Sequence, residues 1–221
     1  MQKRLIIFIP SIEGGGVEKN LFIITNYFED KIDKISVVTV SNKFKKRFTN
    51  KINIVSLRAN FWNRIGRGKK FFVGLCLLFL EIIKDRNVLV FSFQGNIYCT
   101  LLCKLLGVKV VIRANSAPDG WLRSKFKQIL FRYVFVRADK IIVNSLDFKK
   151  RFKKKLKIDA ECIYNPLNKT EIVKKSKIKC KIKFDKKTLN LINIGRHTVQ
   201  KDQLTLLKAV NRIKDRIKFN L

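Results

Sequence analysis

The chain has 221 residues, of which 47% are hydrophobic and 11% aromatic, with only 10 glycines and 3 prolines. This composition excludes a disordered or low-complexity chain and predicts an ordered globular protein, long enough for one domain and part of another. The net charge of +33 indicates a polyanionic partner, namely nucleic acid, an anionic membrane surface or a phosphorylated substrate, although a lysine-rich codon bias would give the same excess on solvated surfaces.

The cysteines and the apolar segments indicate a reduced, cytoplasmic protein. No C-x-x-C pair or histidine cluster accompanies the five cysteines, so we expect no metal ion. No other cofactor is expected. No secretory signal is expected, because the apolar run Leu5–Ile9 ends at Pro10. The longest apolar segment, 71–83, contains Glu81 and is shorter than the roughly 20 residues of a membrane-spanning helix, so we expect a buried helix.

The first predicted elements surround three consecutive glycines. In "LIIFIPSIEGGGVEKNLFIITNYF", the apolar run Leu5–Ile9 predicts a buried strand, and apolar residues at helical spacing predict a helix over 17–29. A glycine turn between a strand and a helix presents backbone N–H groups to an anionic ligand, although the same turn also forms without one. The third glycine of G-x-G-x-x-G is replaced by Lys19 and no G-K-[ST] follows, so neither a dinucleotide site nor a P-loop is supported.

Strand and helix patterns then alternate along the chain. Apolar, β-branched runs predict strands at Leu5–Ile9, Ile35–Val40, Ile52–Leu57, Val88–Phe91, Val108–Ile112 and Lys140–Val143. Helix-length segments lie between most of them, at 17–29, 69–84, 96–106, 122–137 and 145–156. Because strands separated by helices form right-handed βαβ units, we expect an α/β, Rossmann-like parallel sheet with helices on both faces and a ligand site beyond the carboxyl ends of its strands.

The segment 145–157, "SLDFKKRFKKKLK", predicts a strongly basic amphipathic helix. Phe148, Phe152 and Leu156 form one apolar stripe, and seven lysine or arginine residues occupy the other faces. Two interpretations are open. The stripe either docks a surface helix onto the protein's own core, or the helix binds an anionic membrane or RNA.

A second domain is predicted after residue 168. Residues 1–168 form the expected amino-terminal domain, and the lysine-rich stretch 169–188 lacks clear periodicity and predicts an irregular linker. The stretch "LNLINIGRHTVQKDQLTLLKAV" then repeats the opening order of strand (Leu189–Ile194), glycine turn (Gly195) and helix. Residues 189–221 therefore predict the first strand–helix unit of a second Rossmann-like domain, which cannot bury a core by itself.

Five stretches, taken in order, resemble the GT4-type retaining glycosyltransferases of the GT-B fold: "PSIEGGGVEKN", "VVIRANSAP", "DKIIVNS", "IYNPLN" and "INIGRHTVQKD". The pairing of G-G-x-E with a later G-R-x-x-x-x-K is the more specific part. The resemblance implies an acceptor-side amino-terminal domain followed by the start of a nucleotide-sugar-binding domain. The family carries an E-x7-E glutamate pair deeper in that second domain. These 221 residues end before it, so little or no transferase activity is expected from them alone.

On the donor side, the resemblance implies four diphosphate-binding residues. Gly15 and Gly16 correspond to the loop that approaches the donor phosphates, and Arg196 and Lys201 correspond to the cations that bind the diphosphate. Such cations stabilise the negative charge that develops on the leaving nucleoside diphosphate, because arginine binds phosphate bidentately and lysine binds it as a point charge. His197, beside this site, is interpreted as a solvated turn residue.

On the acceptor side, the resemblance implies Arg113 and Asn115, which follow the strand predicted at Val108–Ile112. Some relatives have a histidine in place of Asn115. Because asparagine takes no proton at neutral pH, a general base is unavailable there and no catalytic residue is assigned. Enzymes of this kind are thought to let the departing phosphate help deprotonate the acceptor.

The expected function is therefore transfer of a sugar from a nucleotide-sugar donor to a glycan or lipid-linked glycan, in cell-surface polysaccharide synthesis. The basic surface would contact anionic lipid on the inner face of the cytoplasmic membrane. One alternative is a nucleic-acid-binding protein, favoured by the charge. No helix-turn-helix, zinc, RRM or KH signature supports it, so nucleic acid is not the expected partner. The other alternative is a fragment without function.

Overall fold

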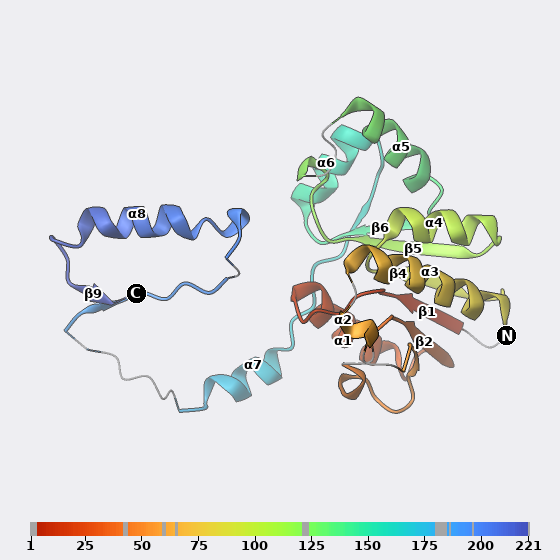
Figure 1. The fold of residues 1–221 in the computed structure, drawn as a ribbon, viewed down its shortest axis with the longest axis horizontal. Coiled ribbons are helices and arrows are strands. Elements are labelled where there is room, and N and C mark those ends of the chain that lie inside the picture. The colour runs from red at the N-terminus through yellow and green to blue at the C-terminus, as the bar shows by residue number, and fades with distance from the viewer. Residues whose placement is uncertain are drawn as a thin grey trace. The chain divides into compact units, whose positions relative to one another are not determined.

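The computed structural model describes residues 4–41, 44–58, 61–64, 66–120, 124–179, 185, 187–195 and 197–220. They divide into two compact units, Met1–Asn168 and Lys169–Leu221. The first unit carries a large sheet with helices on both faces, and the second is a small βαβ unit preceded by a helix (Figure 1).

A seven-stranded parallel sheet forms the centre of the first unit, in the order β3-β2-β1-β4-β5-β6-β7. Its strands are β1 (Arg4–Phe8), β2 (Lys34–Val38), β3 (Asn53–Val55), β4 (Leu89–Ser92), β5 (Lys109–Ala114), β6 (Lys140–Val143) and β7 (Glu161–Cys162). The chain first builds outward from β1 to β3 and then returns to pair β4 with the free side of β1, with Phe8 opposite Ser92. The strand order therefore reverses between β1 and β4, where folds of this class bind their ligands.

Helices cover both faces of the sheet, as predicted. One face packs against α1 (Gly16–Phe28) and the η1 turn (Lys45–Arg47), with Leu21 and Phe22 in its core. The opposite face packs against α3 (Arg67–Ile83), α4 (Asn96–Leu105), α5 (Lys125–Phe135) and α6 (Leu146–Leu156). Short helices α2 (Phe61–Arg64) and η2 (Pro118–Gly120) lie in the connections. The α/β, Rossmann-like fold class is confirmed.

The six strands predicted for this unit are all present, with small differences at their ends. The seventh strand, β7, was missed because it has only two residues and no alternating pattern. Its residues nevertheless pair with β6, with Cys162 opposite Val143. The helix predicted over 122–137 begins after Ser124, whose hydroxyl accepts a hydrogen bond from the backbone N–H of Lys127 and caps the helix.

Helix α6 is a surface helix that its apolar stripe docks onto the protein's own core, which is the first of the two interpretations given above. Phe152 and Leu156 are fully buried against the sheet, and the Phe152 ring stacks on Phe135 with centroids 6.2 Å apart. Part of its positive charge is neutralised locally, because Lys155 and Arg151 both bind Asp119 and lower the pKa of that carboxyl to about 2. The apolar stripe of α6 is therefore used within the protein's own core.

The segment 71–83 is a helix, but the prediction that it is buried was wrong. Leu78 and Ile82 of α3 pack into the core, whereas Phe72, Leu80 and Ile83 are exposed. The sheet covers only one side of the helix, so its apolar residues on the other side face outward. None of the helices in the described residues is long and apolar enough to cross a membrane.

The second unit contains α7 (Lys169–Ser176), β8 (Leu189–Asn190), the η3 turn (Val199–Lys201), α8 (Gln203–Ile213) and β9 (Phe219–Asn220). Helix α7 lies where an irregular linker was expected, and Lys175 pairs with Glu171 one turn away on its surface. Strand β9 was not predicted, and it pairs in parallel with β8. No described residue of this unit is buried, which fits the small amount of structure available to enclose a core.

Candidate functional site

A cavity of about 420 Å³ opens at the carboxyl ends of β4 and β5. Arg113 and Asn115 line it from the end of β5, and Gly95 and Asn96 line it from the start of α4. Val17, directly after the glycine loop of α1, lines it as well. The cavity therefore lies where a parallel sheet of this class binds ligands. Its lining includes both Val17, next to the predicted glycine loop, and the predicted acceptor-side residues Arg113 and Asn115.

Arg113 is the most unusual side chain of this cavity, because it is charged and only 1% exposed. Its Nη2 atom donates to Ile163 O at 3.1 Å and to Asn165 Oδ1 at 2.9 Å, and its Nε atom has no partner among the described residues. Burial lowers the pKa of Arg113, and no described carboxylate pairs with the guanidinium. A buried cation without an anionic partner is costly, so an anion or a polar oxygen in the cavity would stabilise it.

Hydrogen bonds fix the loops that carry these residues. Asn115 Nδ2 donates to Phe93 O at 2.9 Å, which ties the end of β5 to the end of β4. Asn96 Nδ2 donates to Arg113 O at 3.0 Å, and Ser92 Oγ donates to Asn96 Oδ1 at 2.9 Å. The predicted acceptor-side residue Asn115 thus holds the rim of the cavity in place with its amide nitrogen.

Gly95 is the N-cap of α4, and the local backbone requires a glycine there. Its φ of +68° lies in the left-handed region, and a Cβ atom there would lie 2.7 Å from the Phe71 ring. Gly95 and Asn96 were not predicted as site residues, because the strand–turn–helix pattern in which they lie contains no run of glycines. The dipeptide Gly-Asn at a strand–helix junction is the available signal, and it is a weak one.

The glycine loop before α1 has three distinct positions. Gly14 has a φ of +88°, Gly15 caps α1 with extended backbone, and Gly16 is the first helical residue, where a Cβ atom would meet nothing within 4 Å. Glu18, buried, folds back and accepts a hydrogen bond from the backbone N–H of Glu13 at 3.3 Å. The glutamate of G-G-x-E therefore shapes the loop, and the loop leaves open space at Gly16.

Lys201, predicted on the donor side, lies in the second unit. It ends the η3 turn and is exposed, and its aliphatic chain lies against Gly195, whose Cβ would be 3.4 Å from Lys201 Cγ. Asp202 follows with a φ of +45° and caps α8 by accepting from the Thr205 N–H at 3.3 Å. His197 is exposed, as expected. The predicted partner of Lys201, Arg196, lies outside the described residues.

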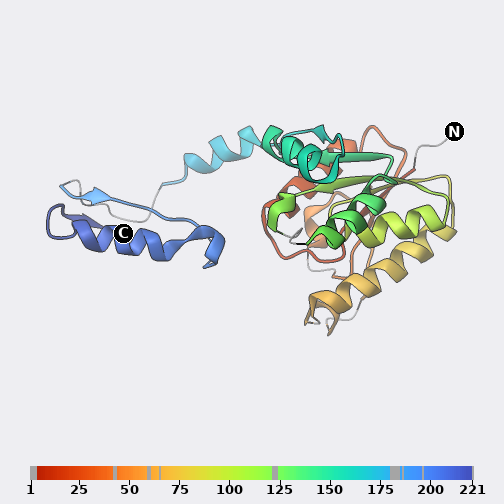
Figure 2. The same cartoon turned by 90° about the horizontal axis from the view of Figure 1, so that it is seen from above.

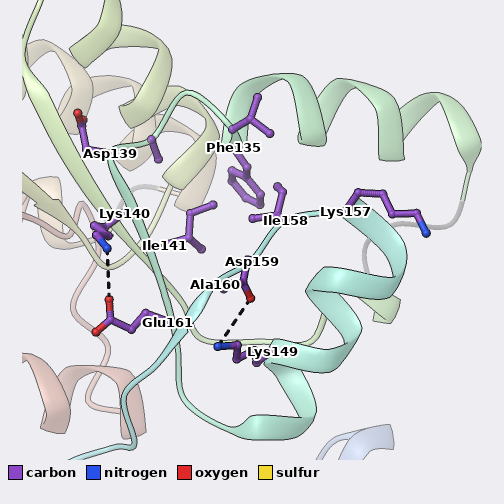
Figure 3. Close-up of a pocket in the computed structure, with 12 residues that line it drawn as sticks. Phe135, Asp139, Lys140, Ile141, Lys149, Lys157, Ile158, Asp159, Ala160 and Glu161 are labelled. Atoms are coloured by element: carbon purple, nitrogen blue, oxygen red, sulfur yellow. Dashed lines mark ion pairs between the residues drawn. The ribbon is translucent and has the colours of Figure 1, made fainter.

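A second cavity, of about 530 Å³, lies at the opposite edge of the sheet, around the amino ends of β6 and β7 (Figure 3). Four of its charged side chains form two ion pairs, with Lys140 Nζ 3.8 Å from Glu161 Oε2 and Lys149 Nζ 3.7 Å from Asp159 Oδ1. Asp139 and Lys157 also line it, and Asp139 pairs with Lys104. None of the predicted site residues lines it. With acidic and basic side chains in equal number in its lining and its position at the amino ends of the strands, it is a weaker candidate for an anionic ligand than the smaller cavity.

Two of the described cysteines take part in core packing. Cys99 and Cys103 are buried in the core between α4 and the sheet, and burial raises the pKa of the Cys99 thiol well above its usual value. No disulfide joins the described cysteines, and no cluster of three or more metal-ligating side chains occurs in the described ranges.

Known proteins resemble this chain in structure but not detectably in sequence. No protein-family model matches the sequence, and neither does any curated protein. Among solved structures, Anabaena HepE in complex with UDP and glucose is similar, with a TM-score of 0.63 and 13% identity over 99% of this chain and 60% of HepE.

Two further structures are similar over nearly the whole chain. Phytolacca americana UGT2, complexed with UDP-2-fluoro-glucose and pterostilbene, has a TM-score of 0.53, with 12% identity over 100% of this chain and 71% of UGT2. A putative UDP-N-acetylglucosamine 2-epimerase from Listeria monocytogenes has a TM-score of 0.54, with 10% identity over 98% of this chain and 60% of the epimerase.

At these identities the similarity establishes the fold alone. The chain has a Rossmann-like α/β architecture that resembles one half of the GT-B fold of glycosyltransferases. It spans about 60% of the length of HepE.

Proposed function

We propose that the protein is a GT4-type retaining glycosyltransferase that moves a sugar from a nucleotide-sugar donor to a glycan or lipid-linked glycan in cell-surface polysaccharide synthesis. The observation that carries the proposal is the Arg113 guanidinium, 1% exposed and without a carboxylate partner among the described residues, at a cavity beyond the carboxyl ends of β4 and β5. Arg113 and the rim residue Asn115 would receive the acceptor.

On the donor side, we propose that Gly15, Gly16, Arg196 and Lys201 bind the diphosphate. The open space at Gly16 supports this assignment, because a phosphate can approach the start of α1 there and meet backbone N–H groups. A uridine nucleotide is the natural first probe, since HepE binds UDP and glucose, and UGT2 binds UDP-2-fluoro-glucose.

In the proposed reaction, the bond between the anomeric carbon and the phosphate oxygen breaks, and an acceptor hydroxyl oxygen bonds to that carbon on the same face. The hydroxyl proton passes to the departing phosphate oxygen, so the products are the glycosylated acceptor and the nucleoside diphosphate. Asn115 takes no part as a base, because an amide is not basic and its nitrogen donates to Phe93 O. Cations on the diphosphate stabilise the charge that develops during bond breaking.

Calorimetric titration with UDP tests the donor site. Replacing Lys201 with methionine should weaken UDP binding about tenfold, because a charge-assisted contact to phosphate is lost. Lys208→Met, at an exposed lysine of α8, is the matched control and should leave the affinity unchanged. Equal affinities for the wild type and the Lys201→Met variant would remove Lys201 from the proposed site.

The transfer itself is tested with the 221 residues joined to the rest of a nucleotide-sugar-binding domain, by release of nucleoside diphosphate from UDP-glucose with and without a membrane lipid extract as acceptor source. Release should depend on the extract, and Arg113→Met should reduce it at least tenfold while UDP affinity stays unchanged. Release that is independent of the extract, or unaltered in Arg113→Met, would contradict the proposed acceptor role.

A further inference from the structure

Helix α5 exposes an apolar stripe that would normally face a core. Phe126, Ile129, Tyr133 and Val136 recur at helical spacing on its outer side, with Phe126 75% exposed. The side of α5 that packs onto the sheet is occupied by other residues, Val134 and Phe135, which are both buried. The stripe is therefore largely left uncovered by the described residues of the first unit.

Helix α4 continues this surface. Tyr98, Leu101 and Leu105 are exposed on its outer side, with Leu105 83% exposed, whereas Cys99 and Cys103 face the sheet. Helices α4 and α5 pack against each other on the same side of the sheet (Figures 1 and 2). We call the surface formed by these two exposed stripes the α4–α5 face.

The charged side chains of α4 and α5 are all basic, and the nearby carboxylate of Asp139, which follows α5, pairs with Lys104 of α4 at 2.6 Å. Neither α4 nor α5 contains an aspartate or glutamate. On α5, Lys125 and Arg132 are exposed along one border of the stripe. The Arg137 guanidinium lies over the Tyr133 ring, 3.3 Å from its centroid. An apolar band with aromatic residues, bordered by cations, is the composition of helices that lie in the interface of an anionic bilayer.

We propose that the α4–α5 face docks the first unit onto an anionic lipid bilayer, with the apolar stripes inserted among the headgroups and the cations against lipid phosphates. The cations complement an anionic surface, which favours lipid over a neutral apolar partner. The sequence suggested α6 as the candidate membrane helix. The structure instead buries the apolar stripe of α6 and leaves that of α5 exposed.

The position of this face suits a lipid-linked acceptor. Tyr98 belongs both to the α4–α5 face and to the lining of the cavity that contains Arg113. A chain docked in this way would hold the cavity beside the membrane surface. This last step rests on the proposed function, whereas docking itself does not.

Flotation of the protein with vesicles on a density gradient, without any sugar donor, tests the docking, because aggregated protein sediments and does not float. The wild type should float with phosphatidylglycerol-containing vesicles, and far less with pure phosphatidylcholine vesicles or at high salt. The Phe126→Ser/Ile129→Ser double variant should reduce the bound fraction at limiting lipid about tenfold, because two apolar side chains no longer insert. Both sites are exposed, so circular dichroism should show an unchanged fold.

A matched pair of tyrosines supplies the control. Tyr133 is 57% exposed on α5, and Tyr27 is 62% exposed on α1, which covers the opposite face of the sheet. Each ring has a cation over it, Arg137 and Lys31 respectively. Tyr133→Ser should weaken flotation several-fold and Tyr27→Ser should not. Equal flotation with neutral vesicles, equal losses for both tyrosine variants, or self-association abolished by the double variant without any flotation would overturn the proposal.

Discussion

The Arg113 guanidinium on β5 donates a hydrogen bond of 2.9 Å to Asn165 Oδ1, 52 residues further along the chain. The same nitrogen donates to Ile163 O at 3.1 Å. This contact ties the end of β5 to the segment that follows β7. The stretches "VVIRANSAP" and "IYNPLN" are thus neighbours in space, joined because a buried cation needs oxygen acceptors.

The two partners of this hydrogen bond should have unequal effects on stability. Asn165→Ala leaves the buried guanidinium with fewer acceptors, and we expect it to lower the free energy of unfolding by about 2 kcal/mol. Arg113→Met removes the buried charge together with the hydrogen bond, and the exposed Asn165 can then bind water. This variant should therefore lower the free energy of unfolding by only about 1 kcal/mol or less. Urea unfolding measures both, and a larger loss for Arg113→Met would contradict this ranking.

The glycine loop permits a separation of conformational from binding effects. Gly14→Ala forces alanine to a φ of +88°, and the free energy of unfolding should fall by about 1 kcal/mol or more. Gly16→Ala places a methyl group in open space at a helix start, so stability should be unchanged or slightly raised. UDP affinity should nevertheless fall in Gly16→Ala, because the methyl group occupies the proposed phosphate approach. Unfolding curves and calorimetry on both variants check the pair.

Because of Glu81 on α3, the free energy of unfolding should fall as the solution becomes acidic. Burial tends to raise its pKa, but hydrogen bonds from Lys84 at 2.6 Å, Arg4 at 2.8 Å and Ser36 at 3.2 Å outweigh burial and hold the pKa below its usual value. Its stabilising contribution is therefore complete above the unfolded-state pKa and is lost as the pH falls through the lowered folded-state pKa.

Glu81→Gln should lower the free energy of unfolding by about 3 kcal/mol at pH 7, because the buried Arg4 loses its close, buried carboxylate partner and keeps only the half-exposed Asp85, at 3.5 Å. Urea unfolding between pH 7 and pH 3 should show the difference between wild type and variant shrinking as the carboxyl is protonated. A difference that stays constant below pH 4 would show that the ion pair contributes nothing beyond packing.

Alanine substitutions of two phenylalanines on neighbouring helices should have very different effects on the free energy of unfolding. Phe152→Ala on α6 removes a fully buried ring from the core and should cost about 3–5 kcal/mol. Phe126→Ala on α5 removes an exposed ring and should change the free energy of unfolding by less than about 0.5 kcal/mol. Thermal or urea unfolding gives both values, and a large loss in Phe126→Ala would mean that the ring is covered in solution.

The sequence was sufficient to predict the strand and helix order of the first unit and its parallel sheet. Apolar runs such as Leu5–Ile9 and Val108–Ile112 were predicted as strands because a strand buried on both faces must be apolar throughout. Alternation with helices then determined a parallel sheet. The position of Arg113 at the end of a strand followed from the same pattern.

The burial of individual side chains was decided by the tertiary structure alone. Periodicity identifies an apolar stripe on a helix, but it does not say whether a neighbouring element covers that stripe. In α6, Phe152 meets the sheet, whereas in α5 Phe126 faces outward, although both belong to apolar stripes at helical spacing. The left-handed backbone of Gly95 and the hydrogen bond from Arg113 to Asn165 likewise depend on packing between segments far apart in the chain, which local sequence patterns do not encode.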